Sequence, residues 1–231
     1  MNGTIGIIGG ADGPTAVMVG MVSTPIDFTA GTIIAFALAV IAAYFLGNIS
    51  PAILIGRAYG IDIKKEGSGN AGTTNVLRVL GKKAAAATLV IDILKGVIAV
   101  LIGRFVEIGF GGDGVFLATV CGIAVMCGHI WPACFKFKGG KGVATAFGVL
   151  VTISPALGFA TLGVVIAVIA ITRRVSPGSI IGALFAPFFA YLFVPGATGG
   201  VCVMAILVIV KHRANIKRIL KGEEPKISFK K

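Results

Sequence analysis

Charged residues are scarce in this chain, and acidic residues are the scarcest of them. Only 13% of the residues are Asp, Glu, Lys or Arg, which is about half the share of an average soluble domain. Together with 56% apolar residues, this excludes a disordered chain and argues against an ordinary soluble domain. The nine acidic residues also leave few carboxylates for a metal site or a general base. The composition therefore places the chain in a lipid bilayer.

The chain also lacks the motifs of several enzyme classes. Its four cysteines form no CxxC pair, which argues against a zinc site or a disulfide framework. The GxxxxGK[ST] spacing of a nucleotide-binding loop is absent, and no Ser/His/Asp triad is visible. We therefore expect no metal, no cofactor and no ATP hydrolysis.

The 21 basic residues give a formal net charge of +12. In a soluble protein this would suggest a nucleic-acid partner. Here the basic residues stand at the ends of apolar runs, as the positive-inside rule describes for membrane proteins. We therefore expect membrane lipids as partners, and no nucleic acid.

The apolar runs predict seven membrane crossings. The run over residues 142–172 is long for a single span and contains Ser154-Pro155, where proline would interrupt a helix. If this run crosses twice, every basic residue except Arg104 and Lys95 falls on one face. The sequence thus predicts an all-α seven-helix bundle, with its N-terminus outside and its C-terminus in the cytoplasm. The runs cover residues 32–55, 84–103, 114–131, 142–172, 177–194 and 198–210.

The first of three polar segments on the predicted cytoplasmic face covers residues 67–78. Its glycines let backbone N–H groups converge on an anion, and Arg78 supplies a bidentate positive charge. The alternative is a flexible polar loop. The candidate binding residues are Ser68, Gly69, Asn70, Thr74, Asn75 and Arg78.

The second segment, residues 137–145, opens an apolar helix with a glycine-rich turn. Such a turn at a helix N-terminus is an anion site, and Lys141 is its natural counter-charge. The alternative is a simple turn at the membrane edge. The candidate residues are Gly139, Gly140, Lys141 and Gly142.

The third segment, residues 211–218, is strongly basic. On a helix, His212 and Asn215 would share one face, and Arg213 and Lys217 another. The alternative is a basic juxtamembrane helix that binds anionic lipid head groups.

Two further features lie within or at the ends of the spans. Asp92 and Lys95 are three residues apart, so we expect an ion pair inside the bundle; a structural role and a substrate role both stay open. His129 is expected to be structural, and Ser50 and Ser176 are expected to cap helices. Taken together, the residues predict a polytopic membrane protein that binds a phosphorylated substrate at its cytoplasmic face.

Five motifs in this order resemble the bacterial acyl-phosphate:glycerol-3-phosphate acyltransferase family, PlsY, over about residues 32–226. The motifs are Ser68-Gly69-Asn70-x-Gly72-x-Thr74-Asn75-Val76-Leu77-Arg78, Asp92-x-x-Lys95-Gly96, Gly128-His129-x-x-Pro132, Gly139-Gly140-Lys141-Gly142-Val143-Ala144-Thr145 and His212-Arg213-x-Asn215-Ile216-x-Arg218.

The resemblance implies an acyltransferase of phospholipid biosynthesis in the bacterial inner membrane, with its site facing the cytoplasm. It would transfer an acyl chain from acyl phosphate to the 1-hydroxyl of sn-glycerol 3-phosphate, giving lysophosphatidic acid and phosphate. The family's seven-helix bundle agrees with the charge count. Use of the substrate's own phosphate as the base, as in the family, would explain the lack of a protein carboxylate for that task.

The resemblance also implies residue roles. Catalysis would involve Lys141, Arg78, Ser68, His212 and Asn215. Substrate binding would involve Gly69, Asn70, Thr74, Asn75, Gly139, Gly140 and Gly142. Asp92 and Lys95 would be a structural ion pair.

The sequence divides into an extension, residues 1–27, and a membrane acyltransferase domain, residues 28–231. Residues 7–16 of the extension resemble a segment in the β-subunit of sodium-translocating decarboxylases, so a non-catalytic subunit of an ion pump is one alternative. A transporter or flippase of a phosphorylated lipid precursor is the other. The absence of a visible internal repeat argues against a transporter.

Overall fold

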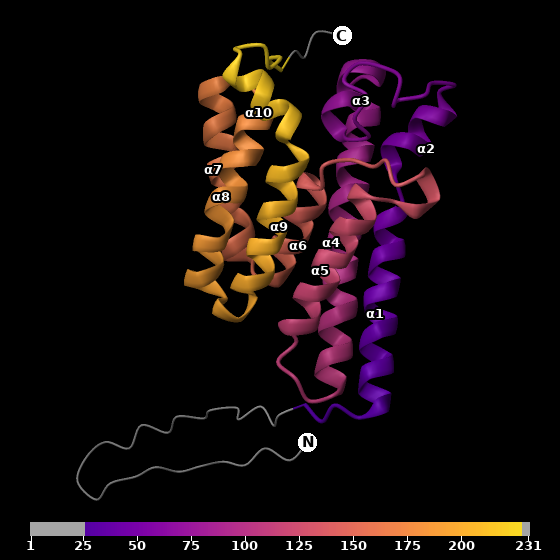
Figure 1. The fold of residues 1–231 in the computed structure, drawn as a ribbon, viewed down its shortest axis with the longest axis vertical. Helices are drawn as coiled ribbons and strands as arrows, with labels where there is room; N and C mark the ends of the chain where they lie inside the picture. The colour runs from indigo at the N-terminus through magenta and orange to yellow at the C-terminus, as the bar shows by residue number, and fades with distance from the viewer. Residues whose placement is uncertain (1–25, 228–231) are drawn as a thin grey trace, which may run out of the picture.

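The computed structural model of the chain describes residues 26–227, which form a bundle of helices (Figure 1). The extension and its decarboxylase-like segment lie outside the described residues, apart from the last two positions. The helices are α1 (Ala30–Asn48), α2 (Pro51–Ala58), α3 (Thr73–Leu80), α4 (Lys82–Gly109), α5 (Phe116–Ile130), the 3₁₀ turn η1 (Ala133–Phe135), α6 (Val143–Ile153), α7 (Pro155–Thr172), α8 (Val175–Phe193), the 3₁₀ turn η2 (Pro195–Ala197), α9 (Thr198–Lys211) and α10 (Arg213–Leu220).

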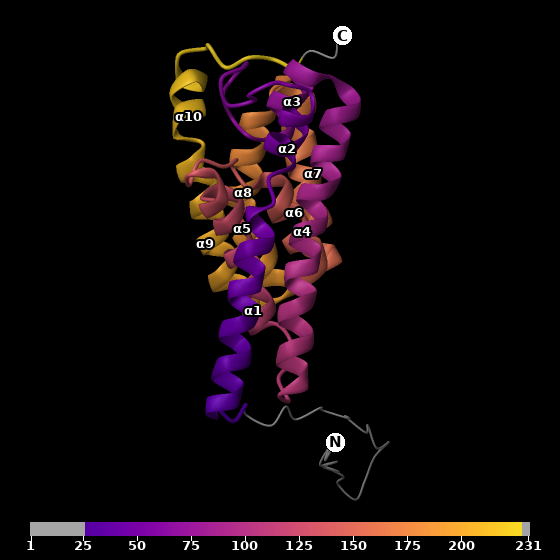
Figure 2. The same cartoon turned by 90° about the vertical axis from the view of Figure 1, so that its right-hand side faces the viewer.

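The bundle has two sides that meet at α6. On one side α1, α4 and α5 pack against one another, and on the other α8 packs between α7 and α9. Helix α6 contacts both α4 and α7, and so joins the two sides (Figure 1). Figure 2 shows α1 and α4 running alongside each other, with α3 and α10 at one end of the bundle.

Five helices in the described part are long and apolar enough to cross a membrane. A sixth span results if α9 with its preceding 3₁₀ turn and α10, which meet at a bend of 58°, are counted as one. Helix α6 is apolar but has only 11 residues. The chain is therefore an integral membrane protein with five or six candidate spans, and the seventh crossing remains a prediction.

The run over residues 142–172 is broken where the sequence predicts. Helix α6 ends at Ile153, and the Ser154 hydroxyl accepts a hydrogen bond from the Leu157 N–H (3.4 Å) at the start of α7. Pro155 is the first residue of α7, where its missing N–H costs no hydrogen bond. Serine and proline together thus end one helix and begin the next.

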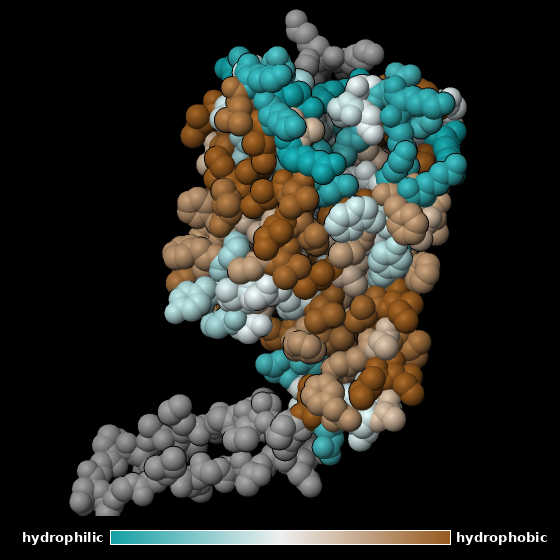
Figure 3. Space-filling view, in the orientation of Figure 1, coloured by the Kyte–Doolittle hydropathy of each residue, from teal (hydrophilic) through white to brown (hydrophobic). Residues whose placement is uncertain are grey.

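Two glycines let α1 and α5 approach closely at their polar ends. A Cβ on Gly47 would lie 2.2 Å from the Val125 carbonyl oxygen, and one on Gly128 would lie 2.1 Å from that of Tyr44. Only glycine fits at such a contact. The loops that follow α2 and α5 therefore meet at one end of the bundle. Hydrophilic residues gather at this end, above an apolar body (Figure 3).

Candidate functional site

Asn75, in the first turn of α3, shapes the first glycine-rich loop. Its side chain is 1% exposed. Its Oδ1 accepts from the Ser68 N–H (2.8 Å), and its Nδ2 donates to the carbonyl oxygens of Ile63 (3.1 Å) and Glu66 (3.0 Å). The amide is therefore occupied by the loop backbone, and Asn75 supports the loop that presents Ser68. A contact of its own with substrate remains a prediction.

The other candidates of this loop lie nearer the surface. Ser68 and Gly69 are exposed, and Gly69 has φ +67°, a left-handed conformation that glycine adopts without strain. Asn70, Thr74 and Arg78 are half-buried. The first loop thus presents a hydroxyl, an amide and a guanidinium at the polar end of the bundle.

Two glycines of the second loop donate backbone hydrogen bonds to the last carbonyls of α5. The Gly139 N–H donates to the Ile130 carbonyl (3.2 Å), and the Gly140 N–H donates to that of His129 (3.1 Å). Both amides are thus occupied by the end of α5, and their part in holding an anion remains a prediction. The last carbonyls of α5 have no partner within their helix, and the loop supplies them with donors.

The start of α6 remains suited to an anion. Gly142 precedes the helix with φ +82°, and no side chain caps the described N-terminus. The first N–H groups of a helix lack partners inside it and carry a partial positive charge. The anion-binding potential of this segment therefore lies at the first turn of α6, next to Lys141.

Lys141 is part of a hydrogen-bonded network that joins its own loop to α8, to α10 and to the residues after α10. Its Nζ donates to Asn215 Oδ1 on α10. Asn215 Nδ2 in turn donates to Ser176 Oγ on α8 (2.7 Å) and to Glu224 Oε1 (2.7 Å). The Asn215 amide is thus oriented with its oxygen toward Lys141.

Glu224 is a member of this site that the sequence did not single out. It is 5% exposed, its Oε1 accepts from Ser176 Oγ (2.5 Å), and its Oε2 accepts from Arg218 Nε (2.8 Å). The expectation that Ser176 caps a helix is wrong, because Ser176 is the second residue of α8 and its hydroxyl donates to this carboxylate. Ser50 stands at the N-cap position of α2 but makes no capping hydrogen bond. The one sequence signal for Glu224 is its place beside Glu223 in a basic tail.

Glu224 is the negatively charged member of this network. Burial acts to raise the pKa of Glu224, but hydrogen bonds from Ser176, Asn215 and Arg218 outweigh it and lower that pKa. The carboxylate is therefore ionised.

The pKa of Lys141 is lowered to about 8, and burial is the largest cause. The positive charges of Arg218, Arg78 and Lys211 act in the same direction, and the negative charge of Glu224 acts in the opposite direction. Cations from the first loop, α9 and α10 thus surround Lys141.

His212 lies at the bend between α9 and α10. It is 3% exposed, and its Nδ1 lies 2.7 Å from the Val208 carbonyl oxygen. His212 and Asn215 are both buried at this bend, so the third polar segment enters the site through its histidine and asparagine.

The structure also brings Asp92 and Lys95 together as a buried ion pair. Lys95 Nζ lies 2.7 Å from Asp92 Oδ1, and both side chains are 2% exposed. His129 Nδ1 is the third member of the cluster, 2.6 Å from Lys95 Nζ. The cluster lies among α1, α4 and α5, behind the second glycine loop.

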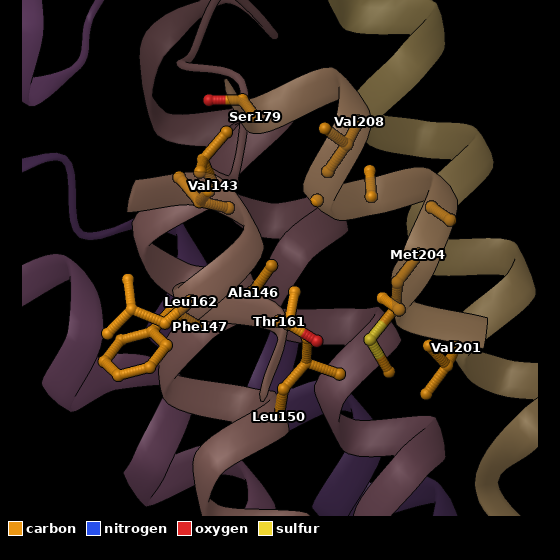
Figure 4. A pocket seen from close by; sticks show the side chains of 15 residues that line it. Val143, Ala146, Phe147, Leu150, Thr161, Leu162, Ser179, Val201, Met204 and Val208 are labelled. Atoms are coloured by element: carbon orange, nitrogen blue, oxygen red, sulfur yellow. The ribbon is translucent and has the colours of Figure 1, made fainter. Parts of the chain in front are cut away.

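An apolar cavity of about 80 Å³ lies between α6, α7, α8 and α9 (Figure 4). It begins at Val143, two residues after Lys141, and extends to Leu150 and Val201. Met204 and Val208 line it from α9, and Ser179 is a polar residue at its rim (Figure 4). A cationic site thus adjoins an apolar cavity.

Known proteins resemble this chain over most of its length. The family model described as glycerol-3-phosphate acyltransferase matches residues 37–222. The glycerol-3-phosphate acyltransferase of Clostridioides difficile (strain 630) is 45% identical over 202 residues, which cover 86% of this chain and 98% of the relative. That of Thermoanaerobacter sp. (strain X514) is 46% identical over 196 residues, covering 84% and 96%.

Two solved structures share the fold. Both are of PlsY (YgiH), an integral membrane glycerol 3-phosphate acyltransferase, and both are 36% identical and cover 84% of this chain and 96% of the solved one. The TM-score is 0.78 for the glycerol 3-phosphate form and 0.76 for the lysophosphatidic acid form. The chain therefore belongs to the glycerol-3-phosphate acyltransferase family.

Proposed function

We propose that this chain transfers an acyl group from acyl phosphate to the 1-hydroxyl of sn-glycerol 3-phosphate, giving lysophosphatidic acid and phosphate. The observation that carries the proposal is the position of Lys141. Its Nζ is held by Asn215 beside the first turn of α6, among further cations and next to an apolar cavity. This combination suits a substrate with a phosphate head and an acyl tail.

The chemistry requires little from the protein beyond position and charge. An acyl phosphate is a mixed anhydride, so its phosphate is already a good leaving group. The substrate hydroxyl oxygen forms a bond to the acyl carbon, and the bond from that carbon to the phosphate oxygen breaks. Lys141 and the first N–H groups of α6 stabilise the charge on the leaving phosphate. The hydroxyl proton passes to a phosphate oxygen of the glycerol 3-phosphate.

The first loop then holds the acceptor. Arg78 and Ser68 bind the phosphate of glycerol 3-phosphate, and the cavity beside Val143 receives the first carbons of the acyl chain. Glu224 is not the base in this scheme, because Ser176, Asn215 and Arg218 already bond its carboxylate. Holding two substrates in one geometry accounts for much of the rate of such a reaction.

We extend the proposal to topology. Seven crossings, with the N-terminus outside and the site facing the cytoplasm, put every basic cluster on one face. The break at Ser154 and the hydrophilic end of the bundle support this arrangement (Figure 3). The location is then the bacterial inner membrane.

The function is tested by phosphate release from the purified protein in detergent. Palmitoyl phosphate with glycerol 3-phosphate is expected to release phosphate, and palmitoyl-CoA with glycerol 3-phosphate is expected to give no product. Phosphate release that does not require glycerol 3-phosphate would indicate hydrolysis of the acyl phosphate and contradict the acyl transfer. No release from folded protein would favour the transporter alternative. Inside-out membrane vesicles given external glycerol 3-phosphate should be active and right-side-out vesicles inactive, which tests the orientation.

The pH dependence follows from Lys141. Its protonated form predominates below about pH 8, so activity is expected to be level below that pH and to fall by about tenfold per unit above it. The measurement is kcat/KM from roughly pH 7 to pH 10, corrected for spontaneous hydrolysis. In Lys141→Arg the side chain stays charged throughout, so any activity it retains should lack this decline. A wild-type profile that stays flat to the alkaline end would contradict the assignment.

A further inference from the structure

The cluster of Asp92, Lys95 and His129 joins three helices behind the second glycine loop. Lys95 Nζ also donates to the carbonyl oxygens of Ile49 (3.0 Å) and Gly47 (3.4 Å) at the end of α1. An ammonium group is favourable at a helix C-terminus, and Asp92 balances its charge. The position of Lys95 is thus determined by α1, α4 and α5 together.

Lys95 orients the His129 ring. His129 Nδ1 lies 2.6 Å from Lys95 Nζ and 3.2 Å from Asp92 Oδ1. Both members of the ion pair therefore contact this edge of the imidazole, and Nε2 stands at the opposite edge.

The opposite edge of the ring lies against the second loop. A Cβ on Gly140 would lie 2.3 Å from His129 Nε2 and 2.7 Å from the Ala71 carbonyl oxygen of the first loop. The carbonyl of His129 also accepts the Gly140 N–H at 3.1 Å. His129 therefore contacts Gly140 through both its ring and its backbone, at the point where the two loops meet.

We propose that His129 is a positioning residue: its buried ring sets the place of Gly140, and so of Lys141, at the substrate phosphate. The proposal rests on the function proposed above and adds a residue to it. Asp92 and Lys95 act through His129 and touch no substrate. The cluster thereby links the core of the bundle to the site.

The test is a double-mutant cycle between His129→Leu and Lys141→Ala, followed by phosphate release. His129→Leu alone is expected to lower kcat by about tenfold to a hundredfold, the cost of a misplacement near 1 Å. In the Lys141→Ala background, His129→Leu should lower the residual rate by less than about twofold, because the ammonium group that His129 positions is already absent. An equal fractional loss in both backgrounds would overturn the proposal, since a purely structural role lowers every rate alike.

Two further variants control for folding. Thr119→Val removes the hydroxyl bond to the Val115 carbonyl at the far end of α5 (2.7 Å), and it should leave kcat unchanged. If His129→Leu fails to fold, His129→Asn replaces it in the cycle. Its amide oxygen can still accept from Lys95, while the ring edge against Gly140 is lost.

Calorimetric titration with glycerol 3-phosphate and with inorganic phosphate, the leaving group, separates this proposal from the proposed function. A wild-type protein that binds both but releases no phosphate from palmitoyl phosphate refutes the acyl transfer alone. His129→Leu is then expected to bind inorganic phosphate about tenfold more weakly than Thr119→Val, and equal binding would overturn the positioning role. A wild-type protein that binds neither would overturn both.

Discussion

Replacing Lys141 by alanine is expected to lower kcat by about a hundredfold to a thousandfold, the usual cost of one charge-stabilising donor. Lys141 supplies the cation beside the first turn of α6, and the leaving phosphate carries the developing charge. The loss should fall on kcat more than on KM, because the attraction between Lys141 and the phosphate strengthens as the bond from the acyl carbon to the phosphate oxygen breaks. Phosphate release at saturating substrate measures it.

Lys138→Ala is the matched control for this change. Lys138 lies three residues earlier in the same loop and is exposed, so its loss should alter the rate little. The melting temperatures of both variants show whether each is folded. Near-normal turnover in folded Lys141→Ala would remove Lys141 from the mechanism.

Gly140→Ala is expected to lower activity by about a hundredfold, the effect of moving a reacting group by about 1 Å. The added Cβ would lie 2.3 Å from His129 Nε2 and 2.7 Å from the Ala71 carbonyl oxygen. The ring is held by Lys95 and the carbonyl belongs to the backbone, so neither can give way easily. The loop must move, and it takes Lys141 with it. Phosphate release by the purified variant, at matched amounts of folded protein, is the measurement.

Gly163→Ala serves as the control for a glycine substitution in this bundle. Gly163 lies in α7 and is exposed. A Cβ added there would have no atom within 4 Å apart from its own turn of helix. Alanine is the better helix former, so activity should be unchanged and the melting temperature equal or slightly higher. Wild-type activity in Gly140→Ala would show that the close contact is not needed for catalysis.

Much of the fold could be predicted because spans depend on local composition. The apolar runs coincide with the long helices, and Ser154-Pro155 ends one helix and begins another as expected. The number of crossings is harder to predict, since α6 has 11 residues and α9 continues into α10 across a bend. Length and hydropathy do not determine whether such a short helix spans the bilayer or is buried among its neighbours.

The site was predictable in part. Glycine-rich loops and the spacing of residues within a motif are local features, so Lys141 and Asn215 could be named from the chain alone. Their contact joins residues 74 positions apart. Glu224 and Ser176, 48 positions apart, were missed as partners because neither stands in a pattern that indicates the other.

The sequence by itself determined the membrane environment, the family and the segments that carry the chemistry, because composition and motif order are properties of the chain. Tertiary structure alone decided how the polar groups are used. The amides of Gly139 and Gly140 bond to α5, the amide of Asn75 supports its own loop, and Glu224 orients Asn215. The physical reason is that buried donors and acceptors must be paired, and folding decides which distant groups are near enough to pair.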